Sequence, residues 1–227
     1  MSNPPLVVFD LDGTLVDTAP DLIATLNVIL GREGLPPVPL ESARAMIGGG
    51  ARVLLERGLA IDNRKPGEAD MKRMLADFID HYARNIAVRS RPFEGLETAL
   101  DALAAGGYAF AVCTNKLEWL SVRLLEELSL RSRFAAICGG DTFGRTKPDP
   151  HSLLQTIAKA GGVPERAIMV GDSAADVGAA RGARVPIVGV TFGYTDTPIA
   201  KLLPDRVIGH MSELEAAVNT LMNKPKS

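Results

Sequence analysis

Four short polar motifs follow apolar runs of this sequence and carry side chains that could do chemistry. In chain order they are Asp10-Leu11-Asp12-Gly13-Thr14, Thr114-Asn115-Lys116, Lys147-Pro148, and Gly171-Asp172-Ser173 with Asp176 one helical turn later. In an open parallel sheet, ligands bind at the carboxyl ends of the strands. If the apolar runs are strands of one such sheet, these motifs meet at one edge and form one site.

The charge of this predicted site indicates a metal. Asp10, Asp12 and Asp172 bring three negative charges and Lys147 returns one. Crowded carboxylates raise one another's pKa and cost several kcal/mol when they are desolvated. Oxygen ligands without nearby His or Cys select a hard divalent cation such as Mg²⁺, which also bridges to phosphate groups. The motifs therefore predict a magnesium site that acts on a phosphoryl group.

Each motif alone has a structural explanation. Asp-X-Asp-Gly-Thr could be a turn, because Asp and Gly favour loops. Gly171-Asp172 and Thr114-Asn115 could be helix N-caps, and Lys147-Pro148 says little in isolation. Caps and turns do not account for all four in this order, each beyond an apolar run.

The apolar runs and the segments between them predict the fold class. Continuous apolar runs are typical of strands that are buried on both faces, as in a parallel sheet. Amphipathic segments of helical length, such as 117–128, 150–160 and 174–183, alternate with them, and Ser212 with Glu215 predicts a capping box for the last helix. This alternation predicts an α/β, doubly wound parallel sheet with a Rossmann-like core. The expected strands are Leu6–Phe9, Tyr108–Cys113, Phe134–Cys138, Ala167–Val170, Pro186–Val190 and Arg206–Ile208.

An inserted unit separates the first two strands. A crossover needs only about a dozen residues, whereas about a hundred lie between Asp10 and Tyr108. Thr18 can cap a helix over 19–32, and apolar residues from Met71 to Ile86 form an amphipathic stripe. We predict an all-α cap domain at 17–89, joined by crossings near Val16 and Ser90 to a core domain of 1–16 and 90–227.

Composition excludes several classes of protein. The chain has 227 residues, is 46% hydrophobic, and has 25 basic against 27 acidic side chains, a net charge of −2. This composition is ordinary for a globular domain, and the small net charge gives no electrostatic attraction to nucleic acid or to an anionic membrane surface. The N-terminus does not resemble a signal peptide, and no apolar run reaches the roughly 18 residues of a membrane helix. Cys113 and Cys138 are expected to be free thiols, which favours a cytoplasmic location.

Taken together, the four motifs resemble those of the haloacid dehalogenase-like hydrolase superfamily, and the helical insert resembles its α-helical cap subclass. Further segments of the sequence are similar to bacterial phosphoglycolate phosphatases. They are Gly139-Gly140-Asp141-Thr142 with Lys147-Pro148-Asp149-Pro150, Gly189 with Gly193-Tyr194, and Ile47-Gly48-Gly49-Gly50-Ala51. The resemblance implies a phosphatase that hydrolyses a small phosphate monoester, with 2-phosphoglycolate as the best candidate substrate.

The resemblance also implies roles for individual residues. Asp10 would be the nucleophile that forms an aspartyl-phosphate, Asp12 would be the general acid and base, and Lys147 would neutralise charge between the nucleophile and the phosphoryl group. Asp10, Asp172 and the backbone carbonyl of Asp12 would bind Mg²⁺. Thr114 and the Asn115 amide would bind the phosphate oxygens. Gly13 would allow the backbone to approach closely, and Thr14 and Asp176 would support the site.

Some features stay open. The glycines around Gly49 could present amides to an anionic group, with charge added by Arg52, or could be a flexible linker between helices. Lys116 and Trp119 are expected at the surface or rim of the helix that follows the second strand. A monomer or a homodimer is compatible with the sequence.

Other functions are also compatible with the motifs. Within the fold the alternatives are a sugar phosphomutase, another small-molecule phosphatase or a pyrophosphatase, whereas a dehalogenase is disfavoured by Asp12. From a different class, the chain could be a non-catalytic module that binds a phosphorylated ligand, although a binder gains nothing from a nucleophile.

Overall fold

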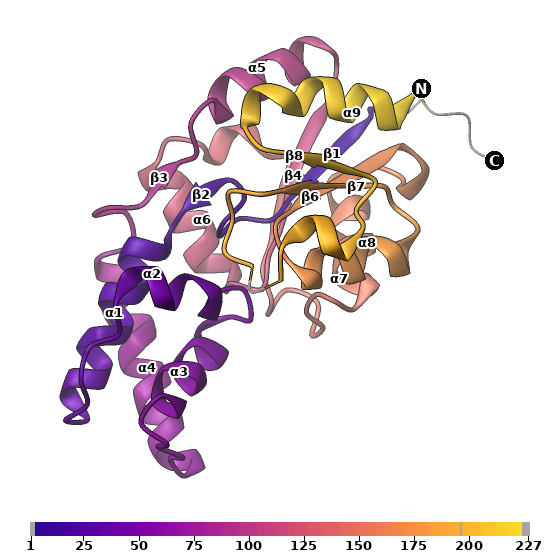
Figure 1. The fold of residues 1–227 in the computed structure, drawn as a ribbon. Coiled ribbons are helices and arrows are strands. Elements are labelled where there is room, and N and C mark those ends of the chain that lie inside the picture. The colour runs from indigo at the N-terminus through magenta and orange to yellow at the C-terminus, as the bar shows by residue number, and fades with distance from the viewer. Residues whose placement is uncertain (1–2, 196, 224–227) are drawn as a thin grey trace.

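The computed structural model describes residues 3–195 and 197–223, and Figure 1 shows a sheet flanked by helices next to a separate group of helices. Within these residues six strands form a parallel sheet in the order β5-β4-β1-β6-β7-β8. This confirms the predicted fold class, and the predicted strand limits agree with the observed ones to within two residues. The strands are β1 (Leu6–Phe9), β4 (Ala109–Cys113), β5 (Ala136–Cys138), β6 (Ala167–Gly171), β7 (Ile187–Val190) and β8 (Arg206–Ile208).

Helices cover both faces of this sheet. One face packs against α5, α6 and α9, and the opposite face packs against α7 and α8 (Figure 1). Alternate residues of a strand point to opposite faces, so Val7 and Phe9 join the first core while Leu6 and Val8 join the second. This explains why the strands are continuously apolar. The helices are α5 (Leu96–Ala105), α6 (Glu118–Glu127), α7 (Pro150–Lys159), α8 (Ala174–Ala183) and α9 (Leu214–Met222), with short 3-10 turns at 131–133, 164–166, 199–202 and 211–213.

The predicted insert is helical. It contains α1 (Ala19–Arg32), α2 (Leu40–Ala43), a 3-10 turn at 44–46, α3 (Ala51–Ala60) and α4 (Glu68–Arg84). The stripe of α4 lies inward as expected: Met71, Met74, Phe78 and Tyr82 are buried against α1 and α3. Burial of this stripe, rather than intrinsic helix propensity, stabilises the group.

The chain crosses between the two parts at a short antiparallel ladder that the sequence does not predict. There β2 (Val16–Asp17) pairs with β3 (Arg91–Pro92). Next to it, the buried Asp21 accepts hydrogen bonds from the backbone N–H groups of Arg89 and Ser90 and from the Ser90 hydroxyl, at 2.7–3.1 Å. One carboxylate thus ties the start of α1 to the returning chain.

Two predicted helix caps are wrong. The Thr18 side chain does not cap α1; its hydroxyl donates to Asp12 instead, at 2.7 Å. The last capping box is formed by His210 and Glu213 rather than by Ser212 and Glu215, because a 3-10 turn at 211–213 precedes α9.

Two predicted features, the free cysteines and the absence of a membrane helix, concern the sheet strands and the helices respectively. Cys113 and Cys138 are free and buried, as predicted, on the neighbouring strands β4 and β5. Among the described helices, none combines the length and apolarity that a membrane crossing requires.

Candidate active site

The four motifs meet at one edge of the sheet. Asp10 follows β1, Thr114 follows β4, Asp172 follows β6, and Lys147 lies in the loop between β5 and α7. The side chains of all four residues are buried. The order of the strands places β1 between β4 and β6, so Asp10 occupies the centre of this group.

Lys147 connects two of the carboxylates. Its Nζ lies 2.8 Å from Asp10 Oδ1 and 2.6 Å from Asp176 Oδ1. Asp176 Oδ2 accepts from the backbone N–H and hydroxyl of Ser173, at 3.0 and 2.7 Å, in the capping box that begins α8. Both oxygens of Asp176 therefore have partners, and its geometry is that of a residue that holds Lys147 in place.

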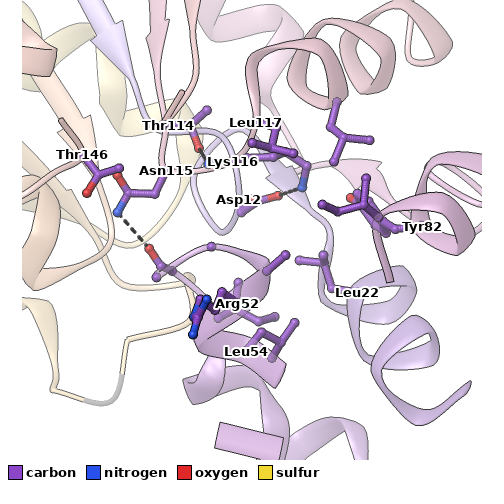
Figure 2. A pocket seen from close by; sticks show the side chains of 18 of the residues that line it. Asp12, Leu22, Arg52, Leu54, Tyr82, Thr114, Asn115, Lys116, Leu117 and Thr146 are labelled. Carbon is purple, nitrogen blue, oxygen red and sulfur yellow. Dashed lines mark hydrogen bonds and ion pairs between the residues drawn. The ribbon is translucent and has the colours of Figure 1, made fainter. Parts of the chain in front are cut away.

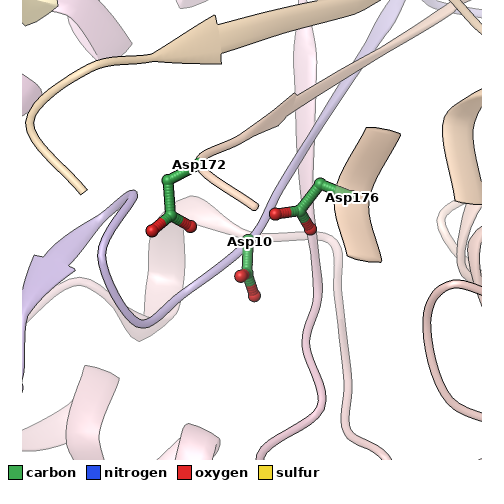
Figure 3. A group of neighbouring side chains, drawn as sticks. All are labelled: Asp10, Asp172 and Asp176. Atoms are coloured by element: carbon green, nitrogen blue, oxygen red, sulfur yellow. The ribbon is translucent and has the colours of Figure 1, made fainter. Parts of the chain in front are cut away.

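The carboxylates of Asp10, Asp172 and Asp176 form an acidic cluster, with one oxygen of each lying within 4.8 Å of the others (Figure 3). Burial raises the pKa of Asp10 to about 6, although the nearby charge of Lys147 opposes the rise. Burial and the charges of Asp176 and Asp10 also raise the pKa of Asp172 well above its ordinary value.

This cluster fits a hard divalent cation. One ammonium group stands against three buried carboxylates, so a cation would offset the burial and the mutual repulsion that raise the pKa values of Asp10 and Asp172. Asp176 accepts three hydrogen bonds, from Lys147 and Ser173. By contrast, each oxygen of Asp172 accepts one and those to Asp10 fall on Oδ1, so Asp10 and Asp172 keep more lone pairs for a ligand. The side chain of Asp12 lies outside this cluster, so the metal-binding role that the resemblance implies for Asp12 would fall to its backbone carbonyl.

The backbone at Gly13 and at Gly193 lies close to the side chain of Asp172. Gly13 has a φ of +83°, and a Cβ atom there would lie 2.5 Å from Asp172 Oδ2. At Gly193 a Cβ atom would lie 2.2 Å from Asp172 Cβ. Gly193 is a site residue that the sequence reasoning treated only as part of a similarity pattern, because its contact with Asp172 spans 21 positions of the chain.

Asp12 lies beside Lys116, which the sequence analysis misplaced. Asp12 Oδ1 accepts from Lys116 Nζ at 2.8 Å (Figure 2) and from the Thr18 hydroxyl at 2.7 Å. Lys116 is buried rather than at the surface or rim, whereas Trp119 is exposed as predicted. The reason is that Lys116 lies under Tyr82 of α4, with Nζ 4.6 Å from the centre of the ring.

Asn115 holds two loops together through its side chain. Its Oδ1 accepts from the Lys147 N–H at 2.9 Å, and its Nδ2 donates to the carbonyls of Lys147 and Gly48, at 3.1 and 3.2 Å. Figure 2 shows the contact that reaches Gly48 in the helical insert. The sequence assigned only the backbone amide of Asn115 to ligand binding and did not predict this bridge.

A cavity of about 290 Å³ lies between the sheet edge and the insert. Its floor includes Asp10, Asp12, Thr114 and Lys116, and its opposite wall comes from 47–54 and from α4 (Figure 2). The floor thus brings the carboxylates of Asp10 and Asp12 to the same cavity.

The two candidate residues from the insert also border this cavity. Gly49 lines it within a run of glycines, and Arg52 lines it as well. The Arg52 guanidinium is half-exposed and pairs with Glu56 at 3.0 Å and Glu68 at 2.7 Å. Its charge is therefore already balanced by two glutamates.

Comparison with known proteins agrees with this geometry. Residues 7–190 match the haloacid dehalogenase-like hydrolase family. The chain is 50% identical over 214 residues to a phosphoglycolate phosphatase of Agrobacterium fabrum, covering 94% of this chain and 92% of that one. It is 46% identical to one of Mesorhizobium japonicum, covering 92% of each. A crystal structure of a predicted phosphoglycolate phosphatase from Haemophilus somnus superposes with a TM-score of 0.87 at 32% identity, covering 94% of this chain and 97% of that one. With its parallel sheet and its four motifs at one edge, the chain belongs to the haloacid dehalogenase-like hydrolase family.

Proposed function

We propose that this enzyme is a Mg²⁺-dependent phosphatase of the cytoplasm that hydrolyses 2-phosphoglycolate to glycolate and phosphate through an aspartyl-phosphate. The observation that carries the proposal is the placement of Asp10 on the cavity floor, in contact with Lys147 and beside Asp172. The relatives named phosphoglycolate phosphatase support the substrate. The buried free thiols of Cys113 and Cys138 support a reducing compartment.

In the first step, an oxygen of Asp10 attacks phosphorus and the ester P–O bond breaks. Asp10 Oδ1 already accepts from Lys147 and from the Leu11 N–H at 2.7 Å, which leaves Oδ2 as the attacking atom. Asp12 gives its proton to the departing oxygen of the alcohol. Lys147 balances the charge that collects around Asp10, and Thr114 with the Asn115 amide would hold the phosphoryl oxygens.

In the second step, Asp12 takes a proton from a water molecule whose oxygen attacks the phosphorus. The bond to Asp10 then breaks, which releases inorganic phosphate and restores the Asp10 carboxylate and the protonated form of Asp12. Mg²⁺, when bound, would supply positive charge to the phosphoryl oxygens. Asp10, Asp172 and the backbone carbonyl of Asp12 would hold it, while Thr14, which donates to Asp172 at 3.3 Å, and Asp176 would keep the ligands and Lys147 in position.

We also propose that 17–89 acts as a cap on a core made of 1–16 and 90–227. The cavity lies between these parts, and the β2–β3 ladder joins them at the proposed boundary. In this position the helices would exclude water from the aspartyl-phosphate and contact the alcohol part of the substrate.

Release of inorganic phosphate from 2-phosphoglycolate and a panel of other phosphate esters tests this function. It is measured with Mg²⁺ and with a chelator, for the wild type, Asp10→Asn, and the exposed control Asp62→Asn. We expect chelation to abolish turnover and Asp10→Asn to lower it by about a thousandfold or more, as is usual for removal of a nucleophile. Asp62→Asn should behave as wild type.

The outcomes separate the parts of the proposal. Turnover that survives both chelation and Asp10→Asn would refute the mechanism. Metal-dependent release from a different ester would keep the mechanism and exclude 2-phosphoglycolate as the substrate. Absence of release from every ester would favour a phosphomutase or a binding module.

A further inference from the structure

The cavity contains a buried cation to which the proposed mechanism gives no task. Lys116 Nζ contacts Asp12 Oδ1 at 2.8 Å, and its side chain is 6% exposed. Burial alone would lower the pKa of Lys116, but the charge of Asp12 outweighs burial and raises it. Lys116 therefore stays an ammonium group with three donors. Asp12 Oδ1 accepts from Nζ, and Nζ also lies 4.6 Å from the centre of the Tyr82 ring, close enough for the charge of Lys116 to oppose the rise in the pKa of the Tyr82 hydroxyl.

A second donor lies beside this ammonium group. Tyr82 is 1% exposed and lines the same cavity, and its hydroxyl has no hydrogen-bond partner within the described part of the chain. Burial raises the pKa of Tyr82 to about 12, so its O–H remains a neutral donor. Buried polar groups without partners are rare and costly, which indicates that a ligand atom completes this one.

The rest of the cavity wall narrows the kind of ligand. Side chains of the insert near Tyr82 are apolar, including Leu22, Leu54 and Phe78. Arg52 already pairs with two glutamates, and Thr114 with the Asn115 amide is assigned to the phosphoryl group, whereas Lys116 and the Tyr82 hydroxyl are donors beside the apolar part of the wall. Two donors, one of them charged, that face a cavity with apolar walls match an anionic oxygen better than a neutral one.

The position of Lys116 also limits the length of the ligand. Its Nζ touches Asp12, the residue proposed to protonate the departing alcohol oxygen, and Thr114 of the proposed phosphate site lies two positions earlier in the same loop. An anion held at Nζ thus lies only a few bonds from the ester oxygen.

We propose that Lys116 Nζ and the Tyr82 hydroxyl bind a carboxylate on the leaving alcohol and so select phosphorylated short hydroxy acids over neutral phosphate esters. The inference rests on the proposed function, because it assumes that the ester lies on Asp10. It adds a specificity site shared between the sheet loop and α4.

Two esters that differ at a single group test the proposal. 2-Phosphoglycolate and ethyl phosphate have the same two-carbon skeleton, with a carboxylate in the first and a methyl group in the second. The readout is the ratio of kcat/KM for 2-phosphoglycolate to that for ethyl phosphate, in the wild type, Lys116→Met, Tyr82→Phe and the exposed control Lys72→Met. We expect the ratio to fall about tenfold or more in Lys116→Met and about threefold or more in Tyr82→Phe, and to stay unchanged in the control.

This ratio separates substrate selection from an indirect effect. If Lys116 acts only by orienting Asp12, both esters slow together and the ratio is constant, which would overturn the proposal. A wild type with no preference for the carboxylate ester would overturn it as well.

A measurement of binding affinity tests the proposal without relying on turnover. The dissociation constants of both esters are measured by calorimetry for Asp10→Asn and for Asp10→Asn with Lys116→Met. If the wild type hydrolyses neither ester, the proposed function fails, yet tighter binding of 2-phosphoglycolate that is lost with Lys116 would still support the carboxylate site. Equal affinity for both esters in the presence of Lys116 would refute it.

Discussion

Asp172 is surrounded so closely that its neighbours determine whether it can act as a ligand. Its Oδ2 accepts from the Tyr194 N–H at 2.7 Å, and its Oδ1 accepts from the Thr14 hydroxyl. Gly13 and Gly193 complete the enclosure, since a Cβ atom at either position would lie within 2.5 Å of an Asp172 oxygen. The proposed metal site therefore depends on two positions that have no side chain.

Substitution of Gly193 tests this dependence. In Gly193→Ala the new methyl group would displace the carboxylate, and a shift of about 1 Å at a reacting centre can cost about a hundredfold in rate. We expect at least a tenfold loss of Mg²⁺-dependent phosphate release and a higher Mg²⁺ requirement, together with about 1–3 kcal/mol of lost stability from overpacking. Steady-state kinetics across a Mg²⁺ titration and urea unfolding measure the two effects.

Gly31→Ala is the matched control. Gly31 lies in α1, and a Cβ atom there would meet nothing within 4 Å. Its replacement should stabilise the helix by up to about 1 kcal/mol and leave the kinetics unchanged. Normal Mg²⁺ dependence in Gly193→Ala would contradict the enclosure of Asp172 described above.

Residues that end a buried strand could be predicted from the sequence, and residues placed by distant partners could not. Asp10 and Asp172 each follow an apolar run, so their positions at the sheet edge follow from the local pattern. Lys116 follows such a run as well, but its burial depends on Tyr82 in α4 and on Asp12, from two other parts of the chain. A single sequence contains no signal for either contact.

At the scale of elements, the connection between the sheet and the insert combines a short ladder with one buried carboxylate. The ladder of β2 with β3 is two residues long on each side, too short to produce an alternating pattern in the sequence. Continuous apolar runs and helical stripes, by contrast, extend over enough residues to be recognised. This is why the sequence predicts the crossings near Val16 and Ser90 but not how they are held.

Asp21 is the residue at this connection whose loss should matter most. Its carboxylate accepts from two backbone N–H groups and one hydroxyl of Arg89 and Ser90. In Asp21→Asn one oxygen becomes an NH₂ donor that faces these donors, so we expect a loss of about 2–3 kcal/mol in the free energy of unfolding. Urea denaturation measures it, with the exposed Asp62→Asn as the control. An unfolding free energy for Asp21→Asn equal to that of the control would show that the connection does not depend on this carboxylate.

The molecule as a whole places its cavity where sheet and insert meet. Three contacts surround that junction: Asn115 with Gly48, Arg44 with Asp17 at 3.2 Å, and the Tyr194 hydroxyl with Asp17 at 2.5 Å. Tyr194 also binds Asp172 through its backbone, so a single residue contacts both the crossing and the acidic cluster. The position of the insert and the geometry of the proposed metal site are therefore structurally linked.

The acidic cluster should make the stability of the whole protein depend on pH and metal together. The pKa of Asp10 is raised from 3.8 to about 6 in the fold, so the folded state binds more protons than the unfolded state between these values. Stability therefore falls as pH rises through this window, by about 3 kcal/mol from this group if no metal is bound. Asp172 is shifted in the same direction and adds to the fall. A divalent cation competes with these protons, so Mg²⁺ should stabilise the protein more at about pH 7.5 than at about pH 5.

Asp10→Asn removes the titration of this group and its charge on Asp172, because the amide keeps the shape of the side chain and cannot ionise. The free energy of unfolding is measured in urea at both pH values, with a chelator and with Mg²⁺, for wild type and variant. We expect the wild type to lose stability relative to Asp10→Asn as pH rises in the chelator, and to recover it with Mg²⁺. A wild type that gains stability relative to the variant over this range, without metal, would show that Lys147 compensates the cluster fully. In that case the fold itself would carry no need for a cation, and the metal requirement would have to come from the phosphorylated substrate.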